Sequence, residues 1–140
     1  MSAGMQLGKV LIVDDDPACL AMLDLALQSL PQFAVISAES AEKALPILET
    51  ERVCAVITDL QLPRMTGVEM ISWIRKQPRL HALPIVVTSA AVDPAAPSQA
   101  LTAGASAYFA KPFSPIAVRN RLRDLVQEYL DRRKGNARDA

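Results

Sequence analysis

Three consecutive aspartates, Asp14, Asp15 and Asp16, directly follow the apolar run Val10–Val13. Carboxylates a few Å apart repel one another, and each raises the pKa of its neighbour. Such a cluster can face water and cap a helix, or it can hold a hard cation such as Mg²⁺, which takes oxygen ligands. The residue types alone leave both interpretations open.

Three later apolar runs also end close to a polar side chain that could take part in chemistry. The carboxylate of Asp59, the hydroxyl of Ser89 and the ammonium group of Lys111 follow these runs. A cation, a lysine and a hydroxyl around one carboxylate are the groups that phosphoryl transfer requires. A carboxylate can itself be the nucleophile and form an aspartyl phosphate. Asp59 is the acid that would lie at the centre of such a set.

The apolar runs are short and almost continuous, which is typical of strands buried on both faces. They are Val10–Val13, Ala34–Ile36, Val53–Ile57, Ile85–Val87 and Ala107–Phe109. Stretches with helical periodicity lie between them. This alternation predicts an α/β fold: a single, doubly wound domain with a parallel five-stranded sheet and helices on both faces. In such sheets ligands bind at the carboxyl ends of the strands, so the polar residues above are expected to meet there.

Each expected helix has a recognisable beginning. The start signals are Asp16-Pro17, Ser40, Thr66-Gly67, the prolines Pro94 and Pro97, and Ser114-Pro115. We therefore interpret Asp16 as a helix cap, not as a metal ligand. The fourth helix is expected to be short and to begin as late as Pro97. The apolar pattern of the fifth ends at about Arg133. These limits predict a tail over residues 1–8, a domain over 9–133 and a second tail over 134–140.

Composition excludes several classes of protein. The 140 residues carry 15 basic and 15 acidic side chains, so the basic excess expected of a nucleic-acid binder is absent. No apolar run approaches the length of a membrane span, and the first residues, MSAGMQLGK, contain no apolar core of a signal peptide. Cys19 and Cys54 lie in apolar runs without metal-binding spacing and are expected to be buried and reduced. We expect a cytoplasmic protein that contacts neither membrane nor nucleic acid directly.

Four segments in order, VLIVDDDP, DLQLPRMTG, PIVVTSA and AGASAYFAKPF, resemble the receiver domain of two-component response regulators. The similarity covers about Lys9 to Leu130. The resemblance implies a flavodoxin-like (βα)5 fold with strand order 2-1-3-4-5. It also implies that Asp59 takes a phosphoryl group from a phosphohistidine on a sensor histidine kinase or a phosphotransfer protein. The cofactor would be Mg²⁺, for which Mn²⁺ can substitute.

The resemblance further assigns the metal ligands. Asp14 and Asp15 form the acidic pair, with Asp15 most directly on the metal. Asp59 is both the phosphoacceptor and a metal ligand, and Gln61 contributes its backbone carbonyl.

The remaining positions of the family pattern concern the phosphoryl group and the signal. Ser89 and Lys111 bind phosphoryl oxygens, and Tyr108 is the aromatic switch residue. The bond from Lys111 to Pro112 is expected to be cis, which is otherwise the minority isomer before proline.

The chain is thus expected to be a signalling switch, not an enzyme, with self-phosphorylation and autodephosphorylation as its only reactions. Phosphorylation would alter the face formed by the fourth helix, the fifth strand and the fifth helix. That face would contact a downstream protein or an output domain outside this chain, or form a homodimer.

Two other functions could use some of these residues. In a phosphatase of the haloacid dehalogenase type, Asp14 and Asp16 would be the nucleophile and the acid, and Ser89 and Lys111 would belong to later motifs. That interpretation leaves Asp59 unexplained. A flavin-binding electron carrier of the same topology would need a phosphate loop after the first strand, where the acids here would repel the phosphate of FMN.

Overall fold

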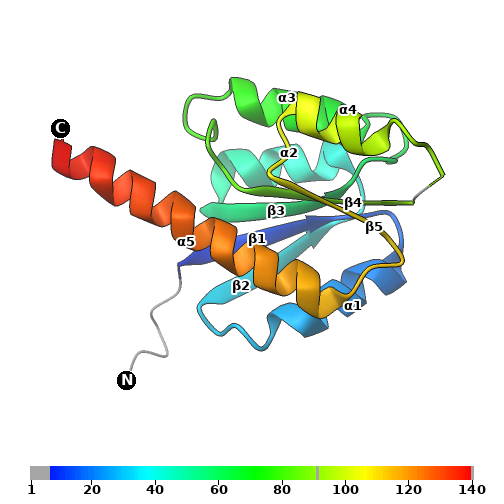
Figure 1. Ribbon diagram of the computed structural model, residues 1–140, viewed down its shortest axis with the longest axis horizontal. Coiled ribbons are helices and arrows are strands. Elements are labelled where there is room, and N and C mark those ends of the chain that lie inside the picture. Colours follow the sequence, from blue (N-terminus) through cyan, green and yellow to red (C-terminus); the bar gives the residue numbers. More distant parts are fainter. Residues whose placement is uncertain (1–6, 91, 140) are drawn as a thin grey trace.

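The computed structural model describes residues 7–90 and 92–139. Within these residues five strands alternate with five helices (Figure 1). The elements are β1 (Gly8–Val13), α1 (Pro17–Leu27), β2 (Phe33–Ala38), α2 (Ala41–Thr50), β3 (Val53–Asp59), α3 (Gly67–Lys76), β4 (Ile85–Ala90), α4 (Ala96–Ala103), β5 (Ala107–Lys111) and α5 (Pro115–Asp139). The strands form one parallel sheet in the order β2-β1-β3-β4-β5. The predicted fold class and strand order are confirmed.

The apolar strands are explained by a hydrophobic core on each face of the sheet. In β1, Val10 and Ile12 belong to the core under α1 and α5, while Leu11 and Val13 belong to the core under α2, α3 and α4. All four side chains are fully buried. Figure 1 shows α1 and α5 on one side of the sheet and α2, α3 and α4 on the other. Because successive strand residues point to opposite faces, a sheet covered on both sides needs apolar residues at every position.

Helices α1, α2, α3 and α5 begin at the predicted caps, whereas α4 has no side-chain cap. Asp16 Oδ1 accepts a hydrogen bond from the backbone N–H of Ala18 at 3.0 Å, and Ser40 caps α2 through its hydroxyl. Thr66 and Glu69 form a reciprocal capping box at the start of α3. Such caps satisfy backbone N–H groups that the first helical turn leaves without partners. They fix where each helix leaves the edge of the sheet.

The ends of some elements differ from the prediction. Helix α4 starts at Ala96, with Pro97 already in its first turn, and β1 starts at Gly8. Helix α5 continues to Asp139 and projects beyond the sheet in Figure 1, so the predicted end at about Arg133 is wrong. The residues after Leu130 are polar and exposed up to Gly135, and without a buried face they carry no apolar periodicity. No described helix combines the length and the apolar composition that a membrane crossing needs.

Candidate functional site

The acids from the ends of β1 and β3 meet at the carboxyl edge of the sheet. One carboxylate oxygen from each of Asp14, Asp15 and Asp59 lies within 4.8 Å of the other two. The strands β1 and β3 are neighbours in the sheet, so the residues that end them emerge side by side. The sequence-based expectation that these three acids gather is therefore met by the geometry.

Asp14 and Asp15 are adjacent but have different surroundings. Asp14 is only 1% exposed, and its Oδ1 accepts a hydrogen bond from the backbone N–H of Asp16 at 2.9 Å. Asp15 is exposed. The pair thus offers one carboxylate fixed by the protein and one facing solvent. A cation that keeps part of its water shell, as Mg²⁺ does, suits such a pair.

Asp59 is the last residue of β3 and is 6% exposed. Its Oδ1 accepts a hydrogen bond from the backbone N–H of Gln61 at 2.9 Å. A Cβ atom at Gly67, the first residue of α3, would lie 2.2 Å from the backbone oxygen of Asp59. Glycine therefore lets α3 begin against the end of β3. This close packing fixes the backbone that carries the central carboxylate.

Lys111 bridges the two buried acids. Its Nζ lies 2.8 Å from Asp59 Oδ2 and 3.1 Å from Asp14 Oδ2. Burial acts to lower the pKa of Lys111, but hydrogen bonds and charges of Asp59 and Asp14 outweigh it and raise the pKa above its ordinary value. The lysine is therefore a cation throughout the physiological range. The bond from Lys111 to Pro112 is cis, the isomer that the family resemblance implies.

Two hydroxyl groups in β4 are buried without a hydrogen-bond partner. They are Thr88 Oγ1 and Ser89 Oγ, and Ser89 has no exposed surface. Ser89 also lines an open pocket of about 420 Å³, together with Gln61 from the β3–α3 loop and Asp93 from the β4–α4 loop. Buried polar groups almost always have partners. Thr88 pairs with Asp59 in the sheet, so Ser89 is the next residue along the neighbouring strand. An unpaired hydroxyl at this position is a group that a bound anion could satisfy.

Tyr108 is the second residue of the edge strand β5. It is half-buried and packs against the core that contains Ala96 and Ala100 of α4. In the sheet it pairs with Val87, two positions before Ser89. The tyrosine thus lies between the core under α4 and the strand β4, which carries the unpaired hydroxyl of Ser89.

The structure adds one neighbour that sequence reasoning placed only in the core. Cys19 is a free, buried thiol. Burial raises its pKa to about 12, and a hydrogen bond to Asp14 adds to the rise. The thiol is therefore neutral and acts as a further polar contact of the Asp14 carboxylate. The helical spacing of α1 could have indicated that Cys19 faces the end of β1, but not this contact.

The fold and the site define a doubly wound α/β domain with three acids and a lysine at the carboxyl edge of its sheet. The chain belongs to the response regulator receiver domain family, which matches residues 10–123. It is 30% identical to a chemotaxis protein CheY homolog of Campylobacter jejuni over 84% of this chain and 92% of that protein.

Other relatives are longer proteins. The identity to the alkaline phosphatase synthesis transcriptional regulatory protein PhoP of Bacillus subtilis is 31%, over 85% of this chain and 48% of that protein. This chain therefore spans about half the length of such relatives. Among solved structures, a response regulator from Chloroflexus aurantiacus is 34% identical with a TM-score of 0.78, covering 86% of this chain and 98% of that one.

Proposed function

We propose that this receiver domain takes a phosphoryl group from a histidine kinase or a phosphotransfer protein onto Asp59. A carboxylate oxygen of Asp59 attacks the phosphorus of a phosphohistidine, and the P–N bond breaks. The imidazole keeps the electron pair of that bond. The observation that carries the proposal is the position of Lys111, whose Nζ lies 2.8 Å from an oxygen of Asp59. It can donate to a phosphoryl group attached there.

Asp14, Asp15 and Asp59 are the residues that would hold Mg²⁺, or Mn²⁺ in its place, and the backbone carbonyl of Gln61 is a further proposed ligand. Their clustered oxygens match the donor type that this hard cation prefers. When bound, the metal neutralises charge on the phosphoryl oxygens. The protein groups position the acceptor: the backbone N–H of Gln61 holds one oxygen of Asp59.

Ser89 and Lys111 would bind the phosphoryl oxygens. The Ser89 hydroxyl has no partner in the described structure, so donating to a phosphoryl oxygen would satisfy it. Lys111 is held between Asp59 and Asp14, so its ammonium group needs to shift only within the site. Both contacts exist only when the phosphoryl group is present, which is a basis for switching.

The signal would leave through the face made by α4, β5 and α5. Tyr108 is proposed as the aromatic switch, because it packs against the core under α4 and lies on β5, the strand that pairs with β4. The exposed Leu101 of α4 offers apolar surface for a downstream protein, for an output domain or for a second copy of the chain. The domain would act as a switch in the cytoplasm, with no reaction beyond its own phosphorylation and dephosphorylation.

The phosphatase and flavin alternatives have less support. The carboxylate of Asp16 accepts the backbone N–H of Ala18 and is exposed, so it caps α1 and does not serve as a second catalytic acid beside Asp14. The carboxylates after β1 also make this edge unsuited to the phosphate of FMN.

Labelling with acetyl phosphate and Mg²⁺, followed by peptide mapping, tests the proposal. We expect one phosphoryl group on Asp59 and none in Asp59→Asn, whose circular dichroism should match the native protein. Asp131→Asn, which removes an exposed acid of α5, is the matched control and should label normally. Label on Asp14, or normal labelling of Asp59→Asn, would contradict the proposal.

A further inference from the structure

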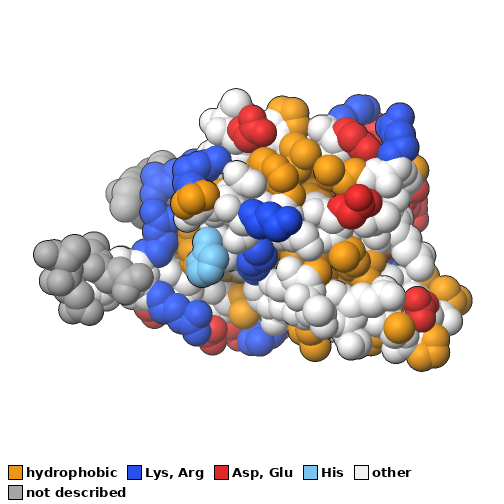
Figure 2. All heavy atoms as spheres, turned by 90° about the horizontal axis from the view of Figure 1, so that it is seen from above, with side chains coloured by type: hydrophobic (Ala, Val, Ile, Leu, Met, Phe, Trp, Pro, Cys, Tyr) orange, Lys and Arg blue, Asp and Glu red, His pale blue; other side chains and the backbone are white. Residues whose placement is uncertain are grey.

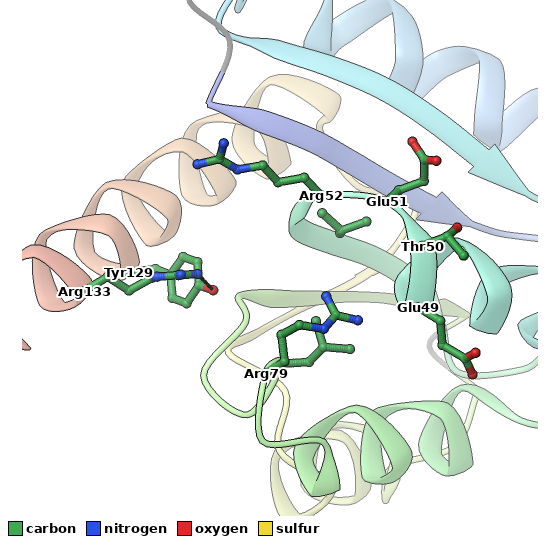
Figure 3. Close-up of a pocket in the computed structure, with 9 residues that line it drawn as sticks. Glu49, Thr50, Glu51, Arg52, Arg79, Tyr129 and Arg133 are labelled. Carbon is green, nitrogen blue, oxygen red and sulfur yellow. Dashed lines mark hydrogen bonds between the residues drawn. The ribbon is translucent and has the colours of Figure 1, made fainter. Parts of the chain in front are cut away.

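A second pocket lies at the opposite end of the sheet, where β3 begins, and it is lined by arginines. Its volume is about 440 Å³, and Arg52, Arg79 and Arg133 contribute to its wall. They come from three separate segments: the turn before β3, the α3–β4 loop and α5 (Figure 3). The fold therefore brings three guanidinium groups from distant parts of the sequence to one place.

The three guanidinium groups are not held in ion pairs. Among the described residues, no carboxylate forms an ion pair with Arg52, Arg79 or Arg133. Two glutamates also line the pocket, but Glu51 is paired with Lys9. In Figure 3 the side chains of Glu49 and Glu51 point away from the space between the arginines. Three guanidinium groups and two carboxylates line the pocket, so its positive excess is small. The three arginines are exposed and are therefore accessible to an anion from solvent.

Two of the three arginines are held in place by neutral groups. Arg79 Nη2 donates to the backbone oxygen of Leu48 at 2.6 Å. Arg133 Nη1 donates to the hydroxyl of Tyr129 at 2.8 Å, and its guanidinium lies 5.5 Å from the centre of the same ring. Such contacts restrict the side chains but leave their charge unbalanced. Side chains fixed in advance lose less entropy when they bind a ligand.

Further charged side chains surround the pocket. An adjoining hollow is lined by Arg132, by Glu128 and by His81, the only histidine of the chain. Figure 2 shows Lys and Arg side chains gathered around this histidine at one end of the molecule. The chain as a whole has no net charge. Basic side chains thus gather at the end of the sheet where β3 begins, and the acidic cluster of Asp14, Asp15 and Asp59 lies at the end where β3 finishes.

We propose that the pocket formed by Arg52, Arg79 and Arg133 binds a small anion that carries two or more phosphate groups. The planar guanidinium fork matches phosphate oxygens through paired hydrogen bonds. Three such groups exceed what a single phosphate needs. The volume falls within the range of roughly 300–1,000 Å³ that small-molecule sites occupy. Binding in this pocket would not require phosphorylation of Asp59, because the two sites lie at opposite ends of β3.

Calorimetric titration of the full chain with inorganic pyrophosphate, without Mg²⁺, tests this site. We expect saturable binding that weakens as salt rises. Replacing one arginine, in Arg52→Gln, Arg79→Gln or Arg133→Gln, should weaken binding by about tenfold, as expected for the loss of a charged hydrogen bond. Arg123→Gln is the matched control, because Arg123 lies on the same α5, is exposed and pairs with Asp124. It should bind like the native chain.

A parallel titration with ATP identifies the source of the phosphates. Tighter binding of ATP would support a nucleotide, and equal binding would support a free polyphosphate. Absence of binding by both probes would overturn the proposal. So would an equal loss in Arg123→Gln, or binding that survives all three arginine substitutions but disappears in Lys111→Met. Labelling of Asp59 by acetyl phosphate should be normal in the arginine variants, which separates this site from the proposed phosphoacceptor.

Discussion

Lys111 and Asp59 are 52 residues apart in the chain, yet the lysine Nζ lies 2.8 Å from the aspartate Oδ2. The same nitrogen lies 3.1 Å from Asp14 Oδ2. One cation is thus shared by two carboxylates that are almost completely buried. The arrangement couples the stability of this edge of the sheet to its proposed chemistry, since a metal ion would compete with the lysine for the same oxygens.

Lys111→Met should destabilise the protein when Mg²⁺ is absent. Two buried carboxylates would then lack a counter-charge, at a cost of roughly 2 kcal/mol for a partly exposed lysine. The variant should still bind Mg²⁺, which should stabilise it more than it stabilises the native chain. Urea unfolding with and without Mg²⁺ measures both effects.

Labelling by acetyl phosphate should be slow in Lys111→Met, because a donor to the phosphoryl group is lost. Lys43→Met removes an exposed lysine whose contact with Glu39 is 3.9 Å long, and it should change neither property. If Mg²⁺ stabilised Lys111→Met no more than the native protein, the shared role of the lysine would be wrong.

Ser89→Ala should weaken binding of beryllofluoride, an analogue of the phosphoryl group, without destabilising the free protein. Its hydroxyl is buried and unpaired, so removing it should raise the free energy of unfolding by about 1 kcal/mol. Thr88→Val removes the neighbouring unpaired hydroxyl and is the matched control. It should show a similar gain in stability with unchanged beryllofluoride affinity. Equal losses of affinity in the two variants would contradict a specific role of Ser89.

Asp15 and Asp16 should respond in opposite ways to substitution. Asp15→Asn should lower Mg²⁺ affinity by about tenfold or more, since a charged oxygen ligand is lost. Asp16→Ala should cost about 1 kcal/mol of stability, because the cap of α1 is lost, and should bind Mg²⁺ nearly as well as the native chain. Calorimetry and thermal unfolding distinguish the two effects.

Asp16→Asn separates the cap of α1 from the charge, because asparagine caps helices as well as aspartate does. This variant should keep both stability and Mg²⁺ affinity. A large loss of Mg²⁺ affinity in Asp16→Asn would show that Asp16 belongs to the metal site.

Stability should fall between pH 9 and pH 11 partly because of Cys54. Burial raises the pKa of its thiol from 9.0 to about 11. In this window the unfolded chain has lost the proton and the folded chain keeps it, so a rise in pH favours unfolding, by up to about 2 kcal/mol. Lys111, whose pKa is raised above 10.5, acts in the same direction at still higher pH.

Cys54→Ala should reduce this alkaline loss, which urea unfolding at both ends of the window measures. Leu27→Ala truncates another buried side chain and should lower stability equally at each pH. A loss in Cys54→Ala as steep as in the native chain would exclude the thiol as its source.

The sequence was sufficient to predict the fold because its signals are local. Continuous apolar runs mark strands covered on both faces, and Asp16, Ser40 and Thr66 mark helix starts through short-range hydrogen bonds. The end of α5 was missed for a physical reason. Helical hydrogen bonds continue through the exposed polar residues after Leu130, where no burial imposes a pattern.

The candidate site was only partly predictable. Because the carboxyl ends of parallel strands meet at one edge, the sequence predicts that Asp14, Asp59, Ser89 and Lys111 lie there. It does not predict which of these side chains form hydrogen bonds with one another. That Lys111 is shared between two acids, and that the Ser89 hydroxyl is unpaired, depend on side-chain positions set by tertiary packing. The arginine pocket was not predicted, since Arg52, Arg79 and Arg133 are unremarkable in the sequence and meet only in the folded chain.

A crystal structure of the chain with beryllofluoride and Mg²⁺ tests directly whether Asp59 is the phosphoacceptor. We expect beryllofluoride on a carboxylate oxygen of Asp59, with Ser89 Oγ and Lys111 Nζ in contact with its fluorines and Mg²⁺ among Asp14, Asp15 and Asp59. Beryllofluoride on another carboxylate, or Lys111 still bridging Asp14 and Asp59 while Ser89 stays unpaired, would contradict it.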